Sequence, residues 1–239
     1  MLNCPATMFW THHELIGARN KRVFDMRIQS AAALFVAVSL SVGSLAHADP
    51  AAKPAASTII APILGQLISF TLPAGFTMQK EQSSSVQYFR SGFLKGETPK
   101  TWTQMIAITA GKNMDPDPNK TAQFIAANIA NDIQKHCPDT FSVKPLGPSK
   151  IDGQDAFVAI TSCGKVGADK HSETALTVTI KGANAVYSIQ WAERTPSNAE
   201  NLTIDEDKWK GRLKQLIPFH VCPIVAGEKA PYPSCGASK

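Results

Sequence analysis

The sequence contains no block of like charge, so it lacks the usual mark of a nucleic-acid-binding surface. Its basic residues are scattered along the chain and do not alternate with aromatic residues as on a phosphate-binding face. The formal net charge is only +5. We therefore expect no nucleic-acid partner.

Catalytic signatures that can be recognised by spacing are also missing after residue 48. This part of the chain has no G-x-S-x-G nucleophile motif, no phosphate-binding glycine loop and no H-E-x-x-H zinc motif. The stretch "SCGK", from Ser162 to Lys165, has the S-x-x-K spacing of penicillin-binding enzymes. That motif acts from the start of a helix, whereas here it falls at the end of an expected strand. The sequence thus predicts no catalytic residue, no cofactor and no metal ligand.

Charged residues are absent from residues 28–48, which are mostly apolar or small. Basic residues precede this stretch, and the triplet Ala46-His47-Ala48 ends it, as in a secretory signal peptide cut after Ala48. Translation from Met26 would give a signal of ordinary length. The alternative is a retained membrane anchor, which the serine and glycine residues of the stretch disfavour. A cysteine at the cleavage site is missing, which excludes a lipoprotein. We expect a periplasmic or secreted protein with no membrane span after cleavage.

Removal of a leader at 1–48 leaves 191 residues, of which 20 are basic and 17 acidic. This length suits one domain of ordinary size. Residues 49–65 are rich in alanine and proline and have no period, so they predict a linker. We expect a single α+β domain over 66–222 and a C-terminal tail over 223–239 that a disulfide tethers.

Cysteine is scarce, and only Cys4 lies in the leader. An even set remains, and in an oxidising compartment it predicts two disulfides: Cys137, Cys163, Cys222 and Cys235. Three pairings are possible. We favour Cys137 with Cys163, where a helix end meets a strand end, and Cys222 with Cys235, which closes a short loop rich in turn residues. A zinc site using His136 and His220 is the alternative, but no C-x-x-C or spaced histidine pair supports it.

Alternating apolar residues predict six strands. They lie at 66–73, 85–90, 101–109, 156–163, 174–180 and 185–193. The first ends in the turn "PAGF", residues 91–100 are expected to be a loop, and "KGAN" joins the last two strands as a hairpin.

Two segments show helical periodicity. In the segment 121–137 the apolar stripe is Ala122, Ile125, Ala126, Ile129, Ile133 and Cys137, and Pro138 ends the pattern. In the closing segment 203–217 the stripe is Trp209, Leu213, Leu216 and Ile217. There, Thr203 and Glu206 have the spacing of a capping box.

The order of elements favours an antiparallel sheet carrying helices over a doubly wound parallel fold. The strand and turn "ISFTLPAGF", the middle helix, the three-strand meander and the closing helix resemble the PsbP-like family, including DcrB-like periplasmic proteins, over residues 66–219. That resemblance implies an αβα sandwich whose members act mostly through protein partners and share no catalytic residue set. We therefore expect an α+β, PsbP-like domain.

The function expected from these observations is that of a non-catalytic, exported bacterial protein that binds an envelope protein or a small ligand. The alternative is a small envelope hydrolase or lyase whose residues meet only in three dimensions. A deep pocket lined by an acid, a base and a nucleophile would favour the enzyme, and a shallow or apolar groove the binding module. Trp102, Trp191 and Trp209 are expected in the core, with an exposed ligand platform as the alternative.

Overall fold

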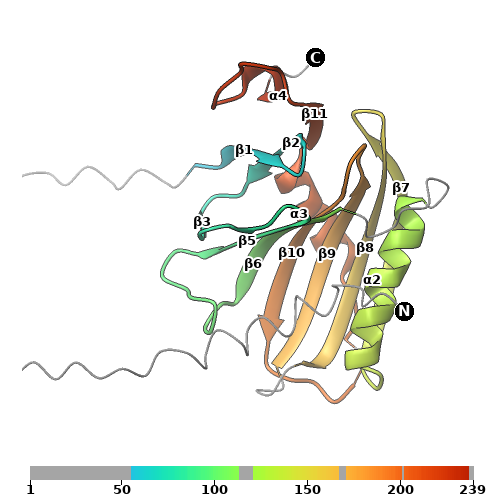
Figure 1. The fold of residues 1–239 in the computed structure, drawn as a ribbon. Helices are drawn as coiled ribbons and strands as arrows, with labels where there is room; N and C mark the ends of the chain where they lie inside the picture. Colours follow the sequence, from blue (N-terminus) through green and yellow to red (C-terminus); the bar gives the residue numbers. More distant parts are fainter. Residues whose placement is uncertain (1–54, 113–120, 167–170, 201, 237–239) are drawn as a thin grey trace, which may run out of the picture.

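A large antiparallel sheet dominates the computed structural model, which describes residues 55–112, 121–166, 171–200 and 202–236 (Figure 1). The strands lie in the order β3 (Phe76–Met78), β5 (Gln87–Leu94), β6 (Gln104–Gly111), β10 (Val186–Thr195), β9 (His171–Lys181), β8 (Gln154–Val166) and β7 (Phe141–Ile151). The short β4 (Gln82–Ser83) pairs with β5. All six expected strand segments form strands, and β5 extends through Leu94 into the expected loop. The expected leader lies outside the described residues.

A second, three-stranded sheet has the order β1 (Ser57–Ile63), β2 (Gln66–Leu72) and β11 (His220–Pro223). Its strand β1 corrects the expected linker, because the chain pairs with β2 from Ser57 onward. The two strands are joined by Leu64 and Gly65, both with positive φ, as in a tight two-residue hairpin turn. Ala61 and Ile63 are buried, so this alanine- and proline-rich segment does contribute to the core.

Three helices complete the described structure: α2 (Ala122–His136), α3 (Glu206–Leu216) and the short α4 (Pro233–Gly236). The helix α2 lies along the β7–β8 side of the large sheet (Figure 1). The expected capping box on α3 is wrong, because Asp205 is the N-cap and its carboxylate accepts a hydrogen bond from the Lys208 N–H at 3.0 Å. The helix α4 lies in the C-terminal tail, for which the sequence predicted a disulfide tether but no helix.

The main core lies between the large sheet, the small sheet and α3. Alternate residues of the central strands point into it, each fully buried aliphatic side chain contributing about 1.5–3 kcal/mol: Ile106, Ile108, Ile160, Leu176, Ile180 and Ile189. Trp102, Trp191 and Trp209 are 3%, 4% and 2% exposed, so they are core residues rather than a ligand platform. Within the described ranges, no helix is long and apolar enough to cross a membrane.

The edge strand β7 was not expected from the sequence. It contains Pro145 and Pro148, and its register shifts between Pro145 and Gly147. Proline cannot donate to a sheet, and a bulge bends a strand, so both features suit an outer edge that resists pairing with another chain. Because most of its side chains are exposed or half-buried, β7 lacks the alternation by which a strand is recognised.

Candidate functional site

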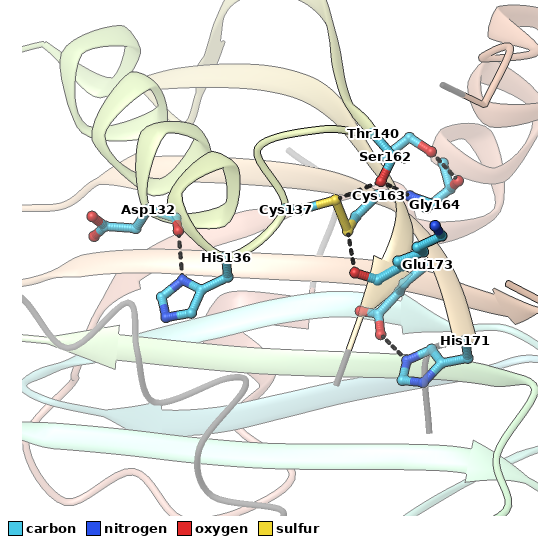
Figure 2. The surroundings of a disulfide bond; sticks show 11 residues. Asp132, His136, Cys137, Thr140, Ser162, Cys163, Gly164, His171 and Glu173 are labelled. Carbon is cyan, nitrogen blue, oxygen red and sulfur yellow. Dashed lines mark hydrogen bonds and ion pairs between the residues drawn. A yellow bond between two sulfur atoms is a disulfide. The ribbon is translucent and has the colours of Figure 1, made fainter. Parts of the chain in front are cut away.

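The structure joins Cys137 to Cys163 and Cys222 to Cys235, the two pairs that the sequence favours. The Cα–Cα distances are 5.9 and 5.6 Å, within the normal range for a disulfide. Cys137 is the C-cap of α2, so the first bond fixes the end of that helix to β8 (Figure 2). The second bond holds α4 against β11.

The polar groups around the first disulfide have structural partners. Ser162, from the S-x-x-K match, is buried on β8, and its Oγ lies 2.7 Å from Thr174 Oγ1. His136 Nδ1 lies 2.8 Å from the backbone oxygen of Asp132, and His171 Nε2 lies 3.4 Å from Glu173 Oε2 (Figure 2). Ser162 and Lys165 are three positions apart on a strand and do not share a face as the helical motif requires.

The zinc alternative finds no support in the described part of the chain. No group of three or more histidine, cysteine, aspartate or glutamate residues is placed there to hold a metal ion. All four cysteine sulfurs of the described residues are in disulfides, which removes the thiolates that zinc would need.

A large cleft opens between α3 and the β7–β8 hairpin, with a volume of about 710 Å³. We call it the α3 cleft. Its lining consists of Ser149, Lys150, Ile151, Asp152, Val158, Val178, Asp207, Lys210, Gly211, Leu213, Lys214, Ile217, Pro218 and Phe219. Val158 and Val178 come from the core face of the sheet and form an apolar floor. The volume falls within the range of small-molecule binding sites, about 300–1,000 Å³.

The opposite side of α3 is fixed to the sheet by a stacked arginine. The Arg212 guanidinium lies 4.7 Å from the Trp191 ring centroid and 4.6 Å from that of Trp209, and it also pairs with Glu193. Lys208 Nζ binds the other oxygen of Glu193 at 2.5 Å. Burial lowers the pKa of Arg212 to about 10, so the side chain remains charged at neutral pH. This contact sets the rotation of α3 about its axis.

With α3 held in this way, one of its other faces borders the cleft. Asp207, Lys210, Gly211 and Lys214 follow the i, i+3, i+4, i+7 spacing of a single helical face, and all four line the cleft. Position 211 carries no side chain, and a Cβ built there would meet nothing within 4 Å. The middle of the helix therefore leaves open space on its cleft side.

The other wall is the tip of the β7–β8 hairpin, which is tied to the small sheet. Asp152 has a positive φ of 47°, and its carboxylate accepts a hydrogen bond from the Val221 N–H at 2.8 Å. The same carboxylate lies 3.1 Å from His220 Nδ1. Ser149 also lines the cleft, but no hydrogen bond joins it to His220 in the described structure. The Asp152 carboxylate and the His220 imidazole hold the tip of this hairpin against the small sheet.

The cationic groups of the cleft differ in their ion pairs. Lys150 Nζ lies 3.9 Å from Asp155, and Lys210 Nζ lies 2.6 Å from Glu206. The hydrogen bond to Lys210 lowers the pKa of Glu206, and the same bond raises the pKa of Lys210. Lys214 forms no ion pair or hydrogen bond with any described residue. It is therefore available to an anionic ligand.

A second, much smaller cavity lies beneath α2. Its volume is about 30 Å³, enough for a water molecule but not for an organic ligand. Ile129 and Ile133 cover it from the helix, and the polar residues Thr177 and Gln190 lie on the sheet side, where Gln190 Nε2 donates to Thr177 Oγ1 at 3.2 Å. The two isoleucines are only half-buried, whereas Ala122, Ile125 and Ala126 nearer the start of the helix are buried.

Sequence reasoning did not single out any residue of the α3 cleft as a binding residue. The available sequence signal was a glycine in the middle of an amphipathic helix, flanked by Lys210 and Lys214 on the same face. That this helical face lies opposite the tip of a hairpin about 60 residues earlier can be seen only in the tertiary structure.

No protein-family model matches the sequence, and a search of curated proteins also finds no match. Solved structures that match include PsbP (CyanoP) from Synechocystis sp. PCC 6803, at 12% identity over 71% of this chain and 92% of that chain, with a TM-score of 0.40. LpqN of Mycobacterium tuberculosis, described as involved in cell envelope biogenesis, matches at 14% identity over 70% and 92%, with a TM-score of 0.35. The Ran-binding protein Mog1p of Saccharomyces cerevisiae matches at 12% identity over 68% and 86%, with a TM-score of 0.36. These neighbours are consistent with a PsbP-like fold.

Proposed function

We propose that the chain is a non-catalytic, exported protein of the bacterial cell envelope that binds a small ligand in the α3 cleft, on a PsbP-like αβα sandwich. One observation carries the proposal: a cleft of about 710 Å³ combines an apolar floor with a charged rim. Ligand sites are commonly concave, mostly apolar and equipped with a few polar groups that orient the ligand. Support for export comes from the leader pattern and from two disulfides, which persist in oxidising compartments.

The proposal is tested with a neutral polarity-sensitive dye, N-phenyl-1-naphthylamine, titrated into the purified exported chain. We expect saturable fluorescence enhancement with one site per chain. The variant Gly211→Phe should fold, because the space at Cβ is open, and should lose the enhancement, because its ring fills the cleft. Retained enhancement in a folded Gly211→Phe chain would show that the dye binds elsewhere, and no enhancement in the wild type would refute the proposal.

A further inference from the structure

The glycine in the middle of α3 has no structural requirement behind it. Gly211 lies within Glu206–Leu216, where glycine is intrinsically less stable than alanine. Its φ is not in the left-handed region, and a Cβ at this position would contact nothing within 4 Å. Neither the backbone nor crowding by neighbours excludes a side chain here. What a side chain would occupy is the α3 cleft itself.

The surface below Gly211 is apolar. Val158 and Val178 belong to the main core cluster, and Leu213 and Phe219 pack at its border. Ile217 lies at the rim with 47% of its surface exposed. An aliphatic chain lying along this surface would remove from water both itself and the exposed parts of Leu213, Ile217 and Phe219, which is the main favourable term in binding apolar groups.

The charges around this surface favour an anion at one end. Lys210 and Lys150 pair with neighbouring carboxylates, whereas Lys214 has no ion pair with any described residue. Lys214 precedes Ile217 by three positions at the C-terminal end of α3, and both residues line the cleft. Of the two cleft carboxylates, Asp152 is engaged by His220 and the Val221 N–H. The other, Asp207, lies in the first turn of α3, at the opposite end of the helix from Lys214.

From this arrangement, and building on the proposed ligand-binding function, we infer that the ligand is a free single-chain anionic amphiphile. Its carboxylate or phosphate group pairs with Lys214, and its aliphatic chain lies over Val158 and Val178 in the space left by Gly211. The site thus has one cationic contact, which favours a negatively charged headgroup, and an apolar surface, which favours an aliphatic chain on the ligand.

The test compares three ten-carbon probes by titration calorimetry, each below its micelle concentration: decanoate, decyltrimethylammonium and neutral decyl maltoside. We expect decanoate to bind the exported chain at least about tenfold more tightly than the cationic probe. Lys214→Gln should weaken decanoate about fivefold to tenfold and leave decyl maltoside unchanged. Lys95→Gln, which removes an exposed lysine that does not line the cleft, is the matched control and should change neither affinity.

The chain-binding half of the inference is tested with Gly211→Leu and Gly211→Phe, both checked for native circular dichroism. Each should abolish decanoate binding, and Gly211→Ala should leave the chain folded and raise its Tm by about 2–4 °C. Equal affinities for the anionic and cationic probes, or no effect of Lys214→Gln, would overturn the ligand class while leaving a neutral-dye site intact. Binding to anionic phospholipid vesicles that decanoate does not compete would assign the surface to a membrane and also overturn it.

Discussion

Replacing Arg212 with methionine should destabilise the protein markedly, because it removes a cation that lies between two aromatic rings. The guanidinium is within 5 Å of both the Trp191 and Trp209 centroids, and its side chain is only 11% exposed. A partly desolvated cation–π contact contributes about 1 kcal/mol, so the two together contribute about 2 kcal/mol. Loss of a charge-assisted bond to Glu193 adds about 1–2 kcal/mol. The methionine side chain offsets about 1 kcal/mol of this loss, because it packs in the same place and has no charge that must be removed from water.

The expected loss is therefore about 2–3 kcal/mol in the free energy of unfolding, or about 4–12 °C in Tm for a chain of this size. The assay is urea unfolding followed by far-ultraviolet circular dichroism, because tryptophan fluorescence would respond to the substitution itself. Lys210→Met is the matched control, since it removes a positive charge from the same helix but breaks only the exposed pair with Glu206. That control should cost less than about 0.5 kcal/mol. Equal effects of the two substitutions would refute the role assigned to the stacked arginine.

Three further predictions concern pH, the disulfides and the leader. Burial raises the pKa of Tyr88 and Tyr187 from 10.0 to about 12. The contribution of these two tyrosines to the free energy of unfolding should therefore be fully present below pH 10 and be lost as the pH rises toward 12. Tyrosinate absorbance that appears well before unfolding would contradict this. Replacing Cys137 and Cys163 with serine should cost about 3 kcal/mol in urea unfolding. Replacing Cys222 and Cys235 with serine should mainly increase hydrogen exchange in α4. A larger loss in the free energy of unfolding than for the Cys137–Cys163 pair would show that the second disulfide contributes more to global stability than the first. N-terminal sequencing of the exported protein should find Asp49, and a start before residue 40 would indicate a retained anchor.

The parts of the fold that could be predicted from sequence are those in which local pattern and burial agree. The central strands β6, β9 and β10 show strong apolar patterning, and α2 has both a helical stripe and the predicted stop near Pro138. The Cys137–Cys163 pair was predicted from the end of a helix and the end of a strand, and the Cys222–Cys235 pair from the short, turn-rich loop that it closes. In each case the signal lies within a segment of the chain and does not depend on a distant partner.

The missed elements depend on partners that the local pattern does not reveal. The strand β1 is rich in alanine and contains Pro62, and only its hairpin with β2 makes it a strand. The strand β7 is an edge strand with two prolines, and β11 has only four residues. The α3 cleft was missed for the same reason, since its floor, helix and hairpin wall come from separate parts of the chain. Local propensity cannot report such contacts.

The position of β11 constrains when the protein can finish folding. Its partner β2 lies near the start of the described residues, and the Thr71 hydroxyl donates to the backbone oxygen of Ile217, 146 positions later. Contacts of such long range are slow to form because a large loop must close first. One edge of β2 therefore stays open during synthesis until residues 220–223 have emerged, and the segment that follows them contains Cys235, which locks the closing strand in place. A chain shortened by its last 20 residues would lose both and leave an unpaired strand edge open to other chains.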